Sequence, residues 1–155
     1  ILETIDGVRG VHMLRSRRMG GAYLIDVHVL VSERLSVSEG HKIAEYVRLK
    51  LIDSHENIHN ALVHIDPEDD SVAISCADLP LRREVLSDLR KVWAEDIDSF
   101  ELKEVTLHYL NGKVHVDLVS RSQPESSNAE QLSQRLHERV KALGYIGDVR
   151  VCKQL

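Results

Sequence analysis

The stretch Ala61–Pro67, with the sequence A-L-V-H-I-D-P, decides how the first half of this chain folds. Its alternating residues predict a short strand that ends at the proline, which lacks a backbone donor. Residues two apart in a strand share a face, so His64 and Asp66 lie together, opposite Val63. An imidazole beside a carboxylate is either half of a metal site or part of a solvated polar surface. Further ligand residues on the same face of the neighbouring strands would favour the metal site.

The segment Ala22–Ser32 predicts a second strand and shows the clearest alternation in the chain. One of its faces is apolar and includes Val27 and Val29, while the opposite face carries Asp26 and His28. A helix has to cover the apolar face, which leaves the histidine on an open face of the sheet.

The preceding segment, Val8–Arg15, predicts a strand with Val11 and Met13 on its apolar side. This phase places His12 on the same open face as the histidines of the other two strands. We expect residues 16–21, which are polar and end in two glycines, to form the hairpin loop that joins the first two strands.

A helix is predicted between the second and third strands. Ser36 and Glu39 have the spacing of a capping box, and apolar residues at helical spacing continue to about Asp53. At ~100° per residue, His41 falls about 120° from the helical position of Val47 in the buried stripe. We therefore expect His41 on the helix side of the sheet, out of reach of the open face within one chain.

The second half of the chain repeats this order of elements with little sequence identity. We expect its helices and strands at Leu81–Ala94, Leu102–Leu110, Val114–Ser120, Ala129–Leu143 and Asp148–Cys152. The predicted fold class is α+β: two tandem ferredoxin-like (split βαβ) units of α-β-β-α-β order, with the helices on one face of each small sheet. We place the units at residues 1–70 and 81–155, joined by a linker at residues 71–80.

The composition argues against several classes of protein. The 155 residues include 20 Lys and Arg against 25 Asp and Glu, and the resulting net charge of −5 argues against a nucleic-acid module. Two cysteines are too few for a disulfide framework, which fits a reducing compartment. No apolar run approaches the ~18 residues of a membrane span. The chain begins at Ile1 without Met, which is typical of a fragment of a longer protein.

The open face of the first predicted sheet gathers the ligands of a zinc-type metal site. Alternation assigns four residues to it: His12, His28, His64 and Asp66. Imidazole and carboxylate are common ligands of such ions, although a histidine-rich polar surface has the same pattern. The corresponding face of the second predicted sheet carries His108, His115, Asp117 and Cys152. This second group is either another metal site or part of an inert packing copy.

Four segments of the first half together resemble the C-terminal cytoplasmic domain of the cation diffusion facilitator transporters. They are G-V-H-M-L-R-S-R at Gly10–Arg17, D-V-H-V at Asp26–Val29, L-S-V-S-E-G-H-K-I-A at Leu35–Ala44 and V-H-I-D-P at Val63–Pro67, in the order found in the family. The resemblance covers about Ile1–Pro67. It leaves the second, diverged unit without an assigned role.

The resemblance implies a ferredoxin-like regulatory domain, not an enzyme, on the cytoplasmic side of a transmembrane metal/proton antiporter. It also implies that this domain binds a divalent metal ion, of which zinc is the first candidate. The family's ligand positions fall on His12, His28, His41, His64 and Asp66, with the helix histidine used in a site shared between subunits. The implied partners are a second copy of the chain and the transmembrane part of the same transporter. The implied location is the cytoplasmic side of a membrane. We expect no nucleic acid and no small-molecule substrate other than metal ions.

Two other functions are compatible with the sequence. The first is a metal-independent dimerisation or docking module with solvated histidines. The second is a zinc hydrolase, because His55–His59 spells H-E-x-x-H. That chemistry needs both histidines on one face of a long helix, whereas this segment is predicted to connect a helix to a strand.

Overall fold

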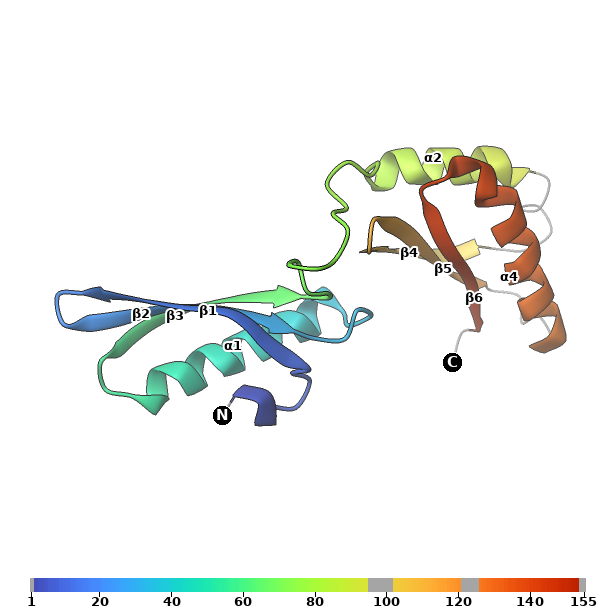
Figure 1. Cartoon of the computed structure of the whole chain (residues 1–155). Helices are drawn as coiled ribbons and strands as arrows, with labels where there is room; N and C mark the ends of the chain where they lie inside the picture. Colours follow the sequence, from blue (N-terminus) through green and yellow to red (C-terminus); the bar gives the residue numbers. More distant parts are fainter. Residues whose placement is uncertain (1, 95–101, 121–125, 154–155) are drawn as a thin grey trace. The chain divides into compact units, whose positions relative to one another are not determined.

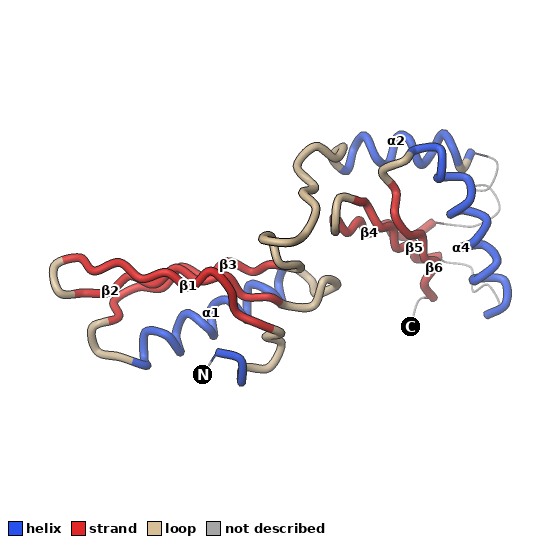
Figure 2. Tube along the Cα trace, in the orientation of Figure 1, coloured by secondary structure: helices blue, strands red, loops and turns tan. Residues whose placement is uncertain are grey.

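The computed structural model describes residues 2–94, 102–120 and 126–153. The chain divides into two compact units, Ile1–Ala73 and Ile74–Leu155. Each unit contains one three-stranded sheet with its own helices (Figures 1 and 2). None of the helices in the described part of the chain has both the length and the hydropathy that crossing a bilayer requires.

The first unit is a three-stranded sheet with one long helix against it. In chain order, its elements are η1 (Leu2–Thr4), β1 (Gly10–Met19), β2 (Ala22–Leu30), α1 (Val37–Ser54) and β3 (Ile58–Asp66). The central strand β2 is antiparallel to β1 and parallel to β3. Figure 1 shows α1 on one side of this sheet, so the other face is left uncovered by the described helices of the unit.

The core of the first unit lies between β2 and α1. Val27 and Val29 of β2 are fully buried, together with Val47 of α1. The predicted alternation of β2 is therefore confirmed, and with it the placement of His28 on the opposite face. The start of α1 is also confirmed, because the Glu39 N–H donates to Ser36 Oγ at 3.2 Å.

The β1–β2 hairpin corrects two predictions. Residues 16–19 pair with β2, so only Gly20 and Gly21 form the turn, with φ values of 56° and 95°. The predicted polar loop at residues 16–21 is wrong because two glycines with positive φ suffice for a tight hairpin turn. Met13 does not face the core: it has φ 52°, is 41% exposed and lies in the bulge that shifts the register between His12 and Arg15.

The second unit repeats the element order of the first. Its elements are α2 (Arg82–Val92), β4 (Leu102–Leu110), β5 (Lys113–Ser120), α4 (Ser126–Val140), η2 (Lys141–Leu143) and β6 (Ile146–Lys153). The central strand β5 is antiparallel to β4 and parallel to β6. The predicted α+β class and its tandem repeat are thus confirmed; in both units, the two parallel strands are direct neighbours in the sheet.

In the described part of the second unit, α2 and α4 both pack on the core. Val85 and Leu89 of α2 and Leu136 of α4 are buried against the same face of β4–β6. Trp93, which follows α2, is 1% exposed, and its indole Nε1–H donates to the Leu136 carbonyl at 3.1 Å. This side chain joins the two helices through both apolar contact and a hydrogen bond.

Candidate metal centre

Three histidines stand in a row across the open face of the first sheet. His12 is opposite His28 in the β1–β2 ladder, and His28 is opposite His64 in the β2–β3 ladder. The rings of His12 and His28 meet edge to face with centroids 5.3 Å apart, while those of His28 and His64 stack at 4.3 Å. The row exists because each strand contributes one histidine in the same pleat phase.

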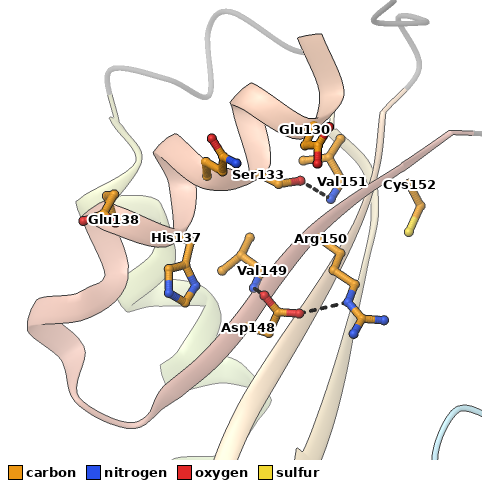
Figure 3. Close-up of a pocket in the computed structure, with 10 residues that line it drawn as sticks. Glu130, Ser133, His137, Glu138, Asp148, Val149, Arg150, Val151 and Cys152 are labelled. Atoms are coloured by element: carbon orange, nitrogen blue, oxygen red, sulfur yellow. Dashed lines mark hydrogen bonds and ion pairs between the residues drawn. The ribbon is translucent and has the colours of Figure 1, made fainter. Parts of the chain in front are cut away.

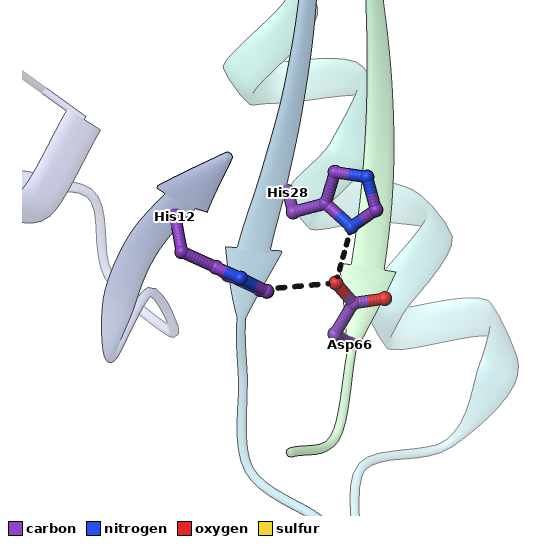
Figure 4. A group of neighbouring side chains, drawn as sticks. All are labelled: His12, His28 and Asp66. Atoms are coloured by element: carbon purple, nitrogen blue, oxygen red, sulfur yellow. Dashed lines mark hydrogen bonds and ion pairs between the residues drawn. The ribbon is translucent and has the colours of Figure 1, made fainter. Parts of the chain in front are cut away.

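Asp66 joins two of these histidines at the carboxyl end of β3. Its Oδ2 accepts a hydrogen bond from His12 Nε2 at 3.1 Å and one from His28 Nδ1 at 2.8 Å (Figure 4). The side chains of Asp66 and His12 are each only 14% exposed. Their ligand atoms and that of His28 all lie within 4.8 Å of one another, close enough for one metal ion to replace the shared protons.

A second group of three ligands shares His28 with the first. Asp26 Oδ1 lies 3.2 Å from His64 Nε2, and these two residues form the second group with His28. This group is more open, with the His64 side chain 43% exposed and that of Asp26 37%. Asp26 was not among the predicted ligands, although its signal was present: the D-x-H pattern of β2 reverses the H-x-D pattern of β3.

The electrostatics of this face favour a cation. Asp69 is a third carboxylate near the histidines, in addition to Asp26 and Asp66, and its Oδ1 lies 3.4 Å from His12 Nδ1. A hydrogen bond from the Ser71 hydroxyl lowers the pKa of Asp69, which keeps this carboxyl ionised. When the three imidazoles are neutral, they do not compensate the negative charges of the three carboxylates. A divalent ion would offset the repulsion between these carboxylates.

The fifth predicted ligand, His41, lies apart from this cluster. It is exposed on α1 and belongs to neither group of three. Because α1 packs against the opposite face of the sheet, one chain does not bring His41 to the ions that Asp66 could hold. Its participation from a second subunit stays a prediction.

The four candidate ligands of the second unit are only partly brought together. His108 Nε2 is 3.1 Å from Asp117 Oδ2, whereas Cys152 is opposite Val119, farther along the sheet. His115 Nδ1 accepts the Asp148 backbone N–H at 3.2 Å, so its neutral ring carries the proton on Nε2 and presents no free lone pair. Among the described residues of this unit, no three ligand atoms come as close together as those of the first sheet.

We therefore expect all specifically bound zinc to sit on the first unit. A chain with the three substitutions His12→Ala, His28→Ala and His64→Ala should take up no zinc at concentrations that saturate the parent chain. Native mass spectrometry during stepwise zinc addition measures this directly. Zinc that remains on the triple variant and disappears after His108→Ala would instead establish a site in the second unit.

The H-E-x-x-H segment does not form the helix that hydrolase chemistry requires. His55 is the C-cap of α1, with extended backbone angles, and His59 lies in β3. His55 Nδ1 also accepts the Asn57 N–H at 3.1 Å. The two histidines thus stand on different elements instead of one turn apart on the same helix.

An open pocket of about 610 Å³ lies between α4 and β6 in the second unit (Figure 3). Several of its polar groups are already paired. Ser133 Oγ accepts the Val151 N–H at 2.9 Å, and the Asp148 carboxylate accepts from the Val149 N–H and from Arg150 Nε. The pocket contains no group of three clustered ligands among the residues that the structure describes, and so offers less for a metal ion than the open face of the first unit.

Comparisons with known proteins address the first unit above all. Residues 1–68 match the family described as the cation efflux protein, cytoplasmic domain. Metal tolerance protein 2 of Oryza sativa subsp. japonica is 44% identical over 68 residues, which cover 42% of this chain and 18% of that protein. The metal-bound C-terminal domain of the CzcD transporter from Thermotoga maritima is 27% identical, with 43% of this chain and 77% of that chain covered and a TM-score of 0.41.

One match extends into the second unit. Metal tolerance protein C1 of Arabidopsis thaliana is 30% identical over 126 residues, which cover 74% of this chain and 27% of that protein. Because 74% of the chain exceeds the length of either unit, the match includes parts of both. The chain thus spans about a quarter or less of the length of these two relatives.

Proposed function

We propose that the first unit, whose residues 1–68 match the family of cation efflux cytoplasmic domains, is the regulatory domain of a divalent-metal transporter. It binds metal ions on its open sheet face and passes the effect of binding to the transmembrane part, on the cytoplasmic side of the membrane. The observation that carries this proposal is the Asp66 carboxylate held between His12 and His28, on strands that are distant in sequence.

Zinc is the ion that these ligands suit best. Two imidazole nitrogens and one carboxylate oxygen are a common three-residue set for Zn²⁺, which adds a fourth ligand to complete a tetrahedron. The site itself supplies three ligands from one chain. The fourth would be water or, in a homodimer, His41 of a second copy. Manganese and iron accept the same donor types, so the preference depends on coordination geometry.

Metal binding would act on the transporter by linkage. An ion that two copies hold together only when they are close stabilises the closed arrangement by its differential binding free energy. The carboxylates on the open face repel one another across such an interface until the ion arrives. Metal availability on this side of the membrane would in this way set the population of the closed dimer.

Zinc affinity should fall steeply in mild acid. A protonated imidazole cannot ligate, and the ordinary pKa of histidine is about 6.5, so lowering the pH from about 7.5 to about 5.5 makes protons compete at two or more ligands. We expect a loss of roughly 100-fold or more, measured by isothermal titration with zinc at each pH. An affinity that does not change over this range would rule out histidine ligands.

A second candidate function is metal-independent dimerisation. Leu14 and Leu62 are exposed by 62% and 58%, and apolar side chains beside the histidines could form an interface without an ion. Sedimentation of the parent chain and of His64→Ala, each with zinc and with a chelator, separates the two functions. A dimer that survives both the chelator and the substitution would favour the docking module over the metal-regulated domain.

A further inference from the structure

A second carboxylate lies behind the candidate ligand His12. While His12 Nε2 faces Asp66, the other ring nitrogen, Nδ1, is buried and makes no hydrogen bond within the described residues. Asp69 Oδ1 is 3.4 Å from this nitrogen, an ion-pair distance that is longer than a usual hydrogen bond. Asp69 comes from the turn after β3 and lies near the ring nitrogen of His12 that does not contact Asp66.

We propose that Asp69 is a positioning residue for His12. Its carboxylate accepts a hydrogen bond from His12 Nδ1–H when Nε2 of the same ring binds the metal ion. This inference rests on the proposed function. A neutral imidazole has one protonated nitrogen and one with a free lone pair, so a ring that ligates through Nε2 must carry its proton on Nδ1. A carboxylate at Nδ1 stabilises that tautomer and makes Nε2 a stronger ligand.

Without a metal ion, His12 has the opposite tautomer, with its proton on Nε2. Asp66 Oδ2 accepts from His12 Nε2, so Nε2 carries the proton, and a neutral ring then turns the lone pair of Nδ1 toward Asp69. Two acceptors facing each other explain why the Nδ1–Oδ1 distance is long. A neutral ring that ligates through Nε2 carries its single proton on Nδ1 instead, so Asp69 would then face a donor in place of a lone pair. The contact with Asp69 therefore favours the metal-bound form over the metal-free form.

Asp69 is held in place before any ion arrives. Its Oδ1 accepts the Ser71 N–H at 2.9 Å and the Ser71 hydroxyl at 2.6 Å. The backbone N–H groups of Val72 and Ala73 both donate to the Asp69 carbonyl, which closes the turn. Because Nδ1 is buried, water cannot readily take over the role of this carboxylate.

The test compares zinc affinities of the full chain with substitutions at neighbouring aspartates. Asp69→Ala removes the acceptor and should weaken zinc binding by roughly 10- to 100-fold, the range found for carboxylates behind histidine ligands. Asp69→Asn keeps a neutral acceptor and should fall between this variant and the parent. Asp70→Ala removes the same charge from an exposed neighbour and should bind zinc like the parent.

A spectroscopic readout separates positioning from a general loss of charge. In the zinc-saturated chain with ¹⁵N-labelled histidines, His12, assigned by its absence from His12→Gln, should be bound through Nε2 with its Nδ1 proton protected from exchange. Asp69→Ala should retain the Nε2 coordination and lose the protection. Coordination through Nδ1, or equal affinities of Asp69→Ala and Asp70→Ala, would overturn the inference while leaving the proposed function intact. A parent chain that binds no zinc would instead refute the proposed function.

Discussion

Replacement of Asp66 by alanine is expected to weaken zinc binding by roughly 100-fold or more, a loss of about 2.7 kcal/mol of binding free energy at minimum. Asp66 is the only residue that contacts both His12 and His28 among the ligand groups of the described structure. Without it, two neutral imidazoles remain, and they supply neither the third ligand nor the negative charge that a divalent ion requires. Native mass spectrometry with stepwise zinc addition, and competition with a chelator of known affinity, measure the effect.

The substitution needs a control because it also removes charge from the surface of the first unit. Asp70→Ala changes the net charge equally on an exposed residue and should retain the full affinity. Circular dichroism of both variants checks that the sheet is folded. If Asp66→Ala is folded and binds zinc as well as Asp70→Ala does, the group of Asp66, His12 and His28 is not the site, and the match of residues 1–68 to the cation efflux family would have to be explained by a different ligand set, such as Asp26, His28 and His64.

Replacement of Trp93 by alanine is expected to destabilise the second unit by about 3–5 kcal/mol, because it leaves a large cavity between α2 and α4. The side chain is 1% exposed, and its Nε1–H bond to the Leu136 carbonyl is lost as well. Urea unfolding followed by circular dichroism should show this unit unfolding at a lower urea concentration than in the parent chain. Zinc bound to the first unit should remain bound through that transition, since Asp66 and its partners lie outside the affected core.

A conservative substitution at the same position separates packing from hydrogen bonding. Trp93→Phe keeps most of the apolar area and loses only the indole donor, so we expect a smaller loss, about 1–2 kcal/mol. A single transition in Trp93→Ala that releases zinc together with all secondary structure would contradict the independence of the two units. The second unit would then be required for the metal site of the first.

Local patterns were sufficient for much of the fold. The alternation in Ala22–Ser32 correctly placed Val27 and Val29 in the core, and the Ser36 capping box correctly placed the start of α1. Such patterns act over a few residues, where the pleat or the helical turn dictates which side chains share a face. For the same reason, the repeat of elements in the second half could be predicted without sequence identity between the halves.

Turns and bulges were harder to predict. The residues after Arg15 look like a loop because they are polar, yet they extend the β1–β2 hairpin as far as Met19. The bulge at Met13 exists only in the pairing of β1 with β2, and it turns an apparently apolar core position into an exposed one. Both features depend on the partner strand, about which a single strand contains no information.

The same division applies to the candidate site. The sequence by itself determined that His12, His28, His64 and Asp66 share one face of a sheet, because that follows from the phase of each strand. Only the tertiary structure decided which of them meet. Register and strand order bring Asp66 between His12 and His28, set Asp26 beside His64, and place Asp69 near Nδ1 of His12.

Tertiary structure also separated the two similar units. Both have two histidines opposite each other on the first two strands, but Asp66 of the first unit lies on the third strand, whereas Asp117 of the second unit lies on the central strand. In the second unit the Asp148 backbone N–H also donates to His115 Nδ1 and so takes up the one lone pair of the neutral ring. The physical reason is that differences of a few tenths of an ångström in the distance between two side chains decide whether they can share a ligand. Long-range pairing, and not local periodicity, sets those distances.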